Sequence, residues 1–127
     1  RLNKRLQKQV VAMYKDGRSK PQIAKMLQRE LGYNAKKAKS IAMTEVNYYK
    51  SEAQLQAIKG VPTKKIWVHN GIGEPRESHL SASGQVADKD GYFTVGGNRT
   101  EAPQHFGIAG EDVNCHCSMR IEVEENE

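Results

Sequence analysis

The chain has 127 residues, with 20 Lys and Arg against 15 Asp and Glu, and a mean hydropathy of −0.76. This length suits one domain of ordinary size, and the composition predicts a soluble, rather polar globule. No run approaches the roughly 20 apolar residues that cross a bilayer, and the basic start lacks the apolar segment of a secretory signal, so we expect neither membrane insertion nor secretion. Because the first residue is not Met, we expect a fragment or processed chain, and whether further domains flank it stays open.

Charge is distributed unevenly along the chain. Residues 1–60 contain 14 Lys and Arg against four Asp and Glu, a balance of +10, whereas residues 61–127 contain six against 11, a balance of −5. A basic half of this strength attracts phosphates or an acidic partner. A solvated, lysine-rich helical surface explains the same composition, so both interpretations stay open.

Three helices are predicted in the first sixty residues. The first has apolar residues three and four positions apart and ends at Asp16-Gly17. The second begins at a plausible N-cap, Ser19, and ends at Gly32. The third covers residues 34–59. Its expected buried face consists of Ile41, Val46, Tyr49, Ala53 and Ile58.

From residue 63 onward the pattern indicates strands and loops. Strands are predicted in "KKIWVHN", in "GYFTVGGN" and in "CHCSMRIEVE", the last with Cys115, Cys117 and Met119 on one face. A short helical or irregular segment contains Arg76 and His79, and a Gly- and Pro-containing loop precedes the final strand.

Together these elements predict an α+β fold, with three N-terminal α-helices packed on a small, irregular antiparallel β unit. We expect a single domain over residues 1–127. It divides into a basic helical part (1–60), a β and loop part (61–123) that ends in the C-x-C strand, and an acidic tail (124–127).

The two cysteines of the chain, Cys115 and Cys117, have several possible roles. A disulfide is disfavoured because residues two apart on a strand lie near the upper limit of the Cα separation that a disulfide accepts. A redox pair is disfavoured because no helix N-terminus is evident to lower a thiol pKa. Two small thiols that close a core strand are the simpler interpretation, since free cysteine is among the most buried residue types.

Zinc binding is the alternative that involves chemistry. On a strand the sulfurs of Cys115 and Cys117 face the same way, and with His79 they make three ligands of the kind that zinc prefers. His69 or His105 would have to complete the site, because the histidine between the cysteines should point away from it.

A helix-turn-helix DNA-binding module is a further alternative. Residues 19–40 would present Lys36, Lys37 and Lys39 to DNA. The third helix is much longer than a typical recognition helix, and its basic residues lie only at its start, which argues against sequence-specific binding.

A nuclease or toxin-like enzyme is the last alternative, with His79 acting together with Glu45 or Arg76. Thr44 and Glu45 lie in the middle of a helix, where such a pair usually makes a solvated face or a local hydrogen bond. No nucleophile elbow, phosphate-binding loop or paired-carboxylate cleft is evident, so the sequence does not support an enzyme.

The order of motifs from about residue 16 to 123 resembles the phage head-morphogenesis, or Mu F-like minor head protein, domain. The motifs are "G-x-S-x-x-x-I-A-x-x-L", "IAMTEVNYYKSEAQLQAIKGV", a Trp strand, "EPRESHLSASGQV", "YFTVGG" and "EDVNCHC". The positions that fit the family pattern are Ala42, Thr44, Glu45, Asn47, Trp67, Arg76, His79, Gly84, Phe93, Pro103, Asn114, Cys115 and Cys117. Met43 and His116 stand where the family usually has Arg, and the turn in "HLSASGQ" is longer than usual.

The resemblance implies a structural and assembly protein of a tailed-phage or prophage head. Such a protein would lie in the virion head interior, and in the host cytoplasm during assembly. It would associate with portal, capsid or scaffold proteins and could contact packaged DNA non-specifically; no small-molecule substrate is implied. Some members occur beside toxin domains in larger chains.

On this resemblance we expect a set of side chains to pin loop, turn and final strand together. That cluster would stabilise the fold through zinc or through hydrogen bonds. Its expected members are Thr44, Glu45, Arg76, His79, Asn114, Cys115 and Cys117.

Overall fold

The computed structural model describes residues 1–70, 76–113 and 115–124. Its first half consists of the helices α1 (Lys4–Lys15), α2 (Lys20–Leu31) and α3 (Ala35–Ala57), as predicted. The remaining elements are β1 (Thr63–Val68), α4 (Glu77–Ser81), β2 (Phe93–Val95), β3 (Asn98–Thr100), α5 (Ala109–Asp112) and β4 (Ser118–Val123). The α+β class is thereby confirmed. No helix within the described ranges is long and apolar enough to span a membrane.

Local capping signals set the ends of α2 and the start of α3. The Ser19 hydroxyl accepts a hydrogen bond from the Gln22 N–H, and the Gln22 side chain accepts one from the Ser19 N–H, which makes a capping box. Gly32 ends α2 with a φ of +69°, a left-handed conformation that favours glycine. Asn34 then caps α3 through the N–H of Lys37.

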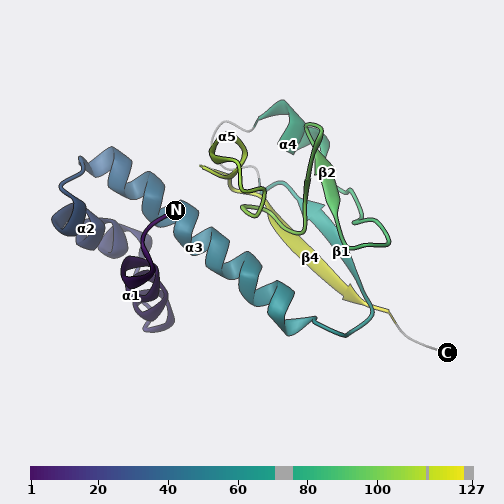
Figure 1. Ribbon diagram of the computed structural model, residues 1–127, viewed down its shortest axis with the longest axis horizontal. Coiled ribbons are helices and arrows are strands. Elements are labelled where there is room, and N and C mark those ends of the chain that lie inside the picture. Colours follow the sequence, from purple (N-terminus) through teal and green to yellow (C-terminus); the bar gives the residue numbers. More distant parts are fainter. Residues whose placement is uncertain (71–75, 114, 125–127) are drawn as a thin grey trace.

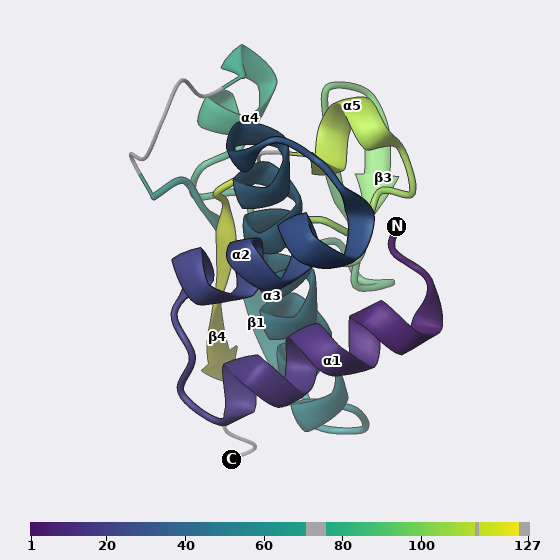
Figure 2. The ribbon, with the colours of Figure 1, turned by 90° about the vertical axis from the view of Figure 1, so that its left-hand side faces the viewer.

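The helices α1 and α2 pack against the first half of α3 and make a hydrophobic core of their own. Figure 1 shows them on one side of α3, and Figure 2 shows them in front of that helix. This core consists of Leu6, Val10, Ile23, Ala24, Met26, Leu27, Ala38, Ala42 and Val46.

The second half of α3 contacts the β unit with the opposite face of the helix. Ser51 is nine residues beyond Ala42, which at about 100° per residue places it half a turn away. Ser51 is buried, and Leu55 packs against the hydrophobic cluster of the β unit. The continuous buried face predicted for this helix is therefore wrong at Ala53, which is exposed. A helix with two neighbours on opposite sides does not keep one apolar stripe.

The β unit contains two antiparallel strand pairs within the described residues. The strands β1 and β4 pair in a register from Thr63 opposite Val123 to Val68 opposite Ser118, and lie side by side in Figure 1. The strands β2 and β3 form a hairpin. On the other edge of β1, Ile66 forms an isolated antiparallel bridge with Val86. Between these pairs lies a second hydrophobic cluster of Trp67, Ala82, Phe93, Val95, Ala102, Cys115, Cys117 and Met119.

The last strand begins later than its sequence predicts. The strand β4 starts at Ser118, whereas the alternating pattern predicts a start at Cys115. The reason is that β1 ends at Val68, opposite Ser118, so no strand is available to pair with residues 115–117. The predicted alternation nevertheless holds, since Cys115 and Cys117 are buried and His116 is half-buried.

Candidate functional site

One imidazole and two thiols meet in the interior of the β unit. The Nδ1 atom of His79 lies 3.4 Å from the Sγ of Cys115 and 3.9 Å from the Sγ of Cys117. One potential ligand atom from each of the three residues lies within 4.8 Å of the others, and the residues are 2%, 2% and 5% exposed. We call this group the His79–Cys115–Cys117 cluster. His79 comes from α4 and the cysteines from the segment just before β4.

A buried glutamine holds the cysteine segment in place. The Nε2 of Gln104 donates hydrogen bonds to the carbonyls of Cys115 (3.0 Å) and Cys117 (3.2 Å), while its Oε1 accepts one from the Ser51 hydroxyl (3.0 Å). Gln104 adopts a φ of +64°, uncommon for a residue other than glycine. Asn47 of α3 adds a hydrogen bond of 3.2 Å to the Cys115 carbonyl. These bonds replace the strand partner that residues 115–117 lack.

Glu111 of α5 contacts the other ring nitrogen of His79. Its Oε2 atom lies 3.3 Å from His79 Nε2, and its side chain is 17% exposed. A carboxylate can only accept a hydrogen bond, so this contact favours the proton on Nε2 and leaves the lone pair of Nδ1 facing the sulfurs. Neither Glu111 nor Gln104 was predicted from the sequence as a site residue. An acidic residue and a glutamine in a loop have no distinguishing spacing.

The two thiols differ in acidity because they contact each other. A hydrogen bond from Cys117 lowers the pKa of Cys115 to about 6, assisted by the adjacent His79. The same hydrogen bond, together with burial, raises the pKa of Cys117 well above its usual range. The pair therefore loses its first proton more readily than an isolated thiol would and holds its second proton more tightly.

Aromatic rings enclose the cluster. The His79 ring stacks on Phe106 with 5.8 Å between centroids and meets Trp67 edge to face at 5.9 Å. The indole Nε1 of Trp67 is buried and has no hydrogen-bond partner within the described part of the chain. It is close enough to Cys117 that its N–H acts to lower the pKa of that thiol, against the larger effects that raise it. A thiolate there would give the indole an acceptor.

Arg76 stands immediately before α4 and connects it to the loop ahead of the cysteines. Its guanidinium donates a hydrogen bond of 2.5 Å to the carbonyl of Val113, and its charge also acts to lower the pKa of Cys117. Asn114, which was expected in the same cluster, lies outside the described residues.

Thr44 and Glu45 lie at a different place on α3. The Glu45 carboxylate, 6% exposed, accepts hydrogen bonds from Arg1 (2.7 Å) and from the N–H of Leu2 (3.2 Å). The Thr44 hydroxyl donates to the carbonyl of Ser40 one helical turn earlier. The structure thus brings together Arg76, His79 and the cysteines, and places Thr44 and Glu45 beside the start of α1.

The two histidines considered as a fourth ligand lie elsewhere. His105 bonds to Glu52 at 2.7 Å and stacks on Tyr48 with 4.1 Å between centroids. His69 is not among the metal-type residues that converge in the described part of the chain, which are those of the His79–Cys115–Cys117 cluster.

The three lysines proposed to contact nucleic acid are exposed at the start of α3. Lys37 lies with its ammonium 4.0 Å from the ring centroid of Tyr33, whereas Lys36 and Lys39 extend from neighbouring positions of the same turn. They belong to the basic helical part of the chain and not to the β unit.

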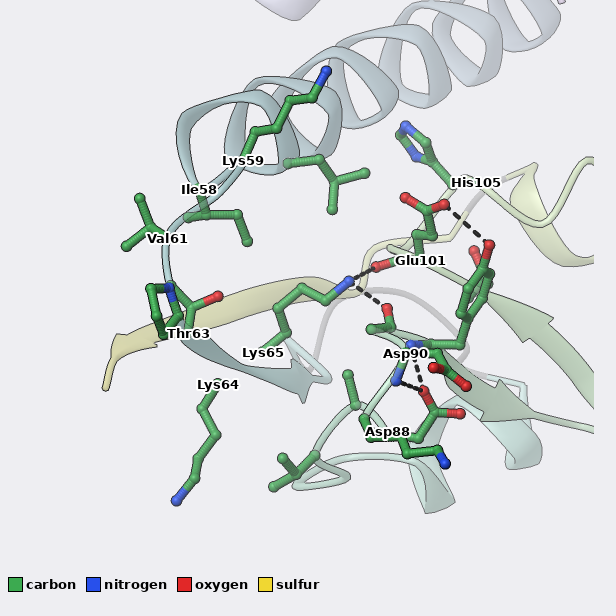
Figure 3. A pocket seen from close by; sticks show the side chains of 18 of the residues that line it. Ile58, Lys59, Val61, Thr63, Lys64, Lys65, Asp88, Asp90, Glu101 and His105 are labelled. Carbon is green, nitrogen blue, oxygen red and sulfur yellow. Dashed lines mark hydrogen bonds between the residues drawn. The ribbon is translucent and has the colours of Figure 1, made fainter. Parts of the chain in front are cut away.

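A polar hollow lies between the end of α3, the start of β1 and the loop at residues 88–91 (Figure 3). Its volume is about 1140 Å³, and the His79–Cys115–Cys117 cluster does not line it. Within it, Lys65 donates hydrogen bonds to the carbonyls of Gly91 (2.5 Å) and Glu101 (2.7 Å), and burial lowers its pKa. Lys65 thus fastens two loops to β1. Lys65 lies two residues before Trp67 and therefore on the same face of the strand, and this spacing predicts that it is buried.

A model of the family described as "Phage Mu protein F like protein" matches residues 4–120, which confirms the resemblance predicted from the motif order. No solved structure matches.

Two relatives of this chain have names that describe different functions. Over 113 residues the chain is 33% identical to the NAD(+)--arginine ADP-ribosyltransferase EFV of Enterococcus faecalis (strain ATCC 700802 / V583), covering 85% of this chain and 23% of that protein. Over 108 residues it is 26% identical to the minor head protein GP7 of Bacillus phage SPP1, covering 81% of this chain and 35% of that protein. The chain therefore spans only a minor part of the length of either relative.

Proposed function

This chain belongs to the phage Mu protein F-like family, and we propose that it is a structural and assembly module of a tailed-phage or prophage head. The observation on which this rests is the family match over residues 4–120 together with the relationship to a minor head protein. We also propose, from the same relationship, that the whole protein containing this module acts with portal, capsid or scaffold proteins.

The different names of the two relatives support a module that is independent of either whole-protein function. A transferase and a minor head protein share this stretch, which is 23% of the first and 35% of the second. One relative is named for ADP-ribosylation of arginine, and we do not propose that activity for this chain. The simplest explanation of a stretch common to both proteins is a module that folds and docks by itself.

The side-chain geometry also favours a structural role for His79. Both of its ring nitrogens have partners, Glu111 on one side and the two thiols on the other, and the residue is 2% exposed. A general base needs a nitrogen within reach of a substrate. The carboxylate once considered as its partner, Glu45, is bonded instead to Arg1 and Leu2.

The basic helical part is the surface that we propose faces DNA in the head interior. Residues 1–60 have a net charge of +10, and Lys36, Lys37 and Lys39 are exposed at one end of α3. Contacts of this kind neutralise phosphates without reading bases, so the binding is expected to be weak, sequence-independent and sensitive to salt. A base-specific footprint would instead favour the helix-turn-helix alternative.

Co-assembly tests the main proposal. The chain is produced with the portal, capsid and scaffold proteins of the genome that encodes it, and particles are separated by sedimentation. We expect the chain in the particle fraction, and omission of portal or scaffold protein identifies the partner. Particles that assemble normally but repeatedly exclude the chain would contradict the assembly role.

Charge reversal tests the DNA-facing surface. The variant with Lys36→Glu and Lys39→Glu is compared with a control of equal charge change, Lys64→Glu with Lys89→Glu, on the β unit. Binding to mixed-sequence duplex DNA is measured against salt concentration. If each lysine neutralises one phosphate, the slope of log K against log salt falls by up to about 2 in the first variant only. Equal effects of the two variants would mean that net charge alone attracts DNA.

A further inference from the structure

We propose that His79 Nδ1 and the sulfurs of Cys115 and Cys117 bind a zinc ion that fastens α4, α5 and the start of β4 together. The inference does not depend on the assembly role, since it concerns the stability of the folded β unit. The metal is identified by the donor set, because thiolate and imidazole select zinc over the oxygen-seeking magnesium and calcium ions.

The observed separations fit a tetrahedral zinc ion. Zinc–sulfur distances of about 2.3 Å and zinc–nitrogen distances of about 2.0–2.1 Å place tetrahedral ligand atoms about 3.6 Å apart for a nitrogen–sulfur pair and about 3.8 Å apart for two sulfurs. The two nitrogen–sulfur distances are 3.4 and 3.9 Å, and all three ligand atoms lie within 4.8 Å of one another. An ion at the common centre requires movements of only a few tenths of an ångström in the two nitrogen–sulfur distances.

The imidazole is already oriented as a ligand. Glu111 lies 3.3 Å from Nε2, so the nitrogen that faces the sulfurs is the one with the free lone pair. Histidines that bind metals almost always donate their second ring N–H to a carboxylate, a carbonyl or a water, which fixes both ring orientation and tautomer. Glu111 is accordingly the positioning residue of this site, acting through His79 without touching the ion.

The indole of Trp67 is an independent observation that points to a charged sulfur. Its Nε1 is buried without a hydrogen-bond partner in the described residues, although buried polar groups are rarely left so. Trp67 lies in the same buried cluster as Cys117, and its ring meets the ligand His79 edge to face with 5.9 Å between centroids. A neutral thiol is a weak acceptor, whereas a zinc-bound thiolate is a good one. Zinc binding deprotonates Cys117 and thereby gives this N–H its acceptor.

A zinc ion at this position would stabilise the β unit. In the described residues the hydrophobic cluster of the β unit has only eight buried members, and residues 115–117 have no strand partner. A small core that buries little apolar area is commonly reinforced by a metal or by disulfides. His79 and the cysteines are about 36 residues apart in sequence, so one ion would close a long loop. The described residues supply three of the four positions of a tetrahedral ion.

Cobalt titration tests the site directly. Reduced, metal-free chain is titrated with Co²⁺, and absorbance is followed for tetrahedral ligand-field bands and for thiolate-to-cobalt charge transfer. Because Cys115 and Cys117 are the two cysteines of the chain, the charge-transfer signal reports this site alone. We expect saturation at one equivalent and displacement of cobalt by one equivalent of zinc. A parallel metal analysis of chain purified without chelator should find about one zinc per chain.

Variants separate the ligands from their neighbours. His79→Gln should abolish the cobalt signal, whereas His116→Gln, which changes the histidine between the cysteines, should retain it. Glu111→Gln should keep one equivalent and weaken the affinity by about 10–100-fold. Glu122→Gln, an exposed change on β4, is its matched control and should bind as the parent does. Circular dichroism of each variant shows whether it is folded before it is titrated.

Two results would overturn the proposal. The first is a parent chain that is folded and reduced but shows no thiolate-to-cobalt charge transfer and co-purifies with no zinc. The second is a signal that His79→Gln and His116→Gln reduce equally, which would place the ion elsewhere. Either result would leave the cluster as hydrogen-bonded thiols and imidazole, and neither would affect the co-assembly experiment.

Discussion

Replacement of Gln104 with Met tests whether this one side chain holds the cysteine segment to α3. Gln104 is 2% exposed and takes part in three hydrogen bonds, with Ser51, with the Cys115 carbonyl and with the Cys117 carbonyl. Methionine has a similar length and volume, so the change removes the hydrogen bonds while it leaves little cavity. The unfavourable φ of +64° is present in both proteins and cancels in the comparison.

The expected cost follows from counting the groups that lose a partner. Each hydrogen bond contributes a net ~0.5–1.5 kcal/mol, so three of them give roughly 1.5–4.5 kcal/mol. The Cys115 carbonyl keeps its hydrogen bond from Asn47, which reduces the loss. We therefore expect Gln104→Met to lower the free energy of unfolding by about 2–3 kcal/mol. For a domain of this size, that corresponds to a fall in melting temperature of roughly 6–15 °C.

The assay is urea denaturation followed by circular dichroism, with the free energy taken from the midpoint at a common slope. The measurement is made in chelator and again with saturating zinc, so that any binding contribution is separated from the hydrogen bonds. Gln9→Met, a partly exposed change on α1, is the matched control and should shift stability by no more than about 0.5 kcal/mol. A loss below about 1 kcal/mol for Gln104→Met would refute the reasoning.

Three further changes have expected outcomes. Ser19→Ala removes the capping box of α2 and should cost about 1 kcal/mol in urea denaturation. Lys65→Met removes two partly buried hydrogen bonds and should lower the free energy of unfolding by about 1–3 kcal/mol in the same assay. Hydrogen bonds from Gln56 and His105 hold the pKa of Glu52 below its usual range, so its contribution is present above about pH 4.5 and is lost as the pH falls through the folded pKa. The stability difference between the parent and Glu52→Gln, measured by thermal melting, should therefore shrink from about pH 6 to about pH 3; a difference independent of pH would contradict this.

The elements that local signals specify were predictable, and so was the class of the fold. The N-cap at Ser19 and the left-handed Gly32 bound α2 where the sequence placed them, because a cap satisfies backbone groups within a few residues of itself. The alternation around Cys115 and Cys117 was also correct in burial, since period-two alternation of an extended chain does not require a strand partner.

Features that depend on two distant segments were not predictable. The buried face of α3 changes side between Ala42 and Ser51, and only the presence of α1 and α2 on one side and the β unit on the other explains it. The strand β4 begins at Ser118 because β1 ends opposite it. The residue pattern of one strand contains no information about where its partner strand ends.

The sequence by itself determined three helices with the Ser19 cap of the second, a basic first half, a set of zinc-type side chains and the order of motifs that identifies the family. Each of these depends on residue type and on spacing along the chain. The tertiary structure alone decided which groups meet: Glu111 with His79, Gln104 with the cysteine carbonyls, and Glu45 with Arg1 rather than with His79. Those contacts join residues 11 to 44 positions apart, and their geometry depends on how two cores pack on opposite faces of α3.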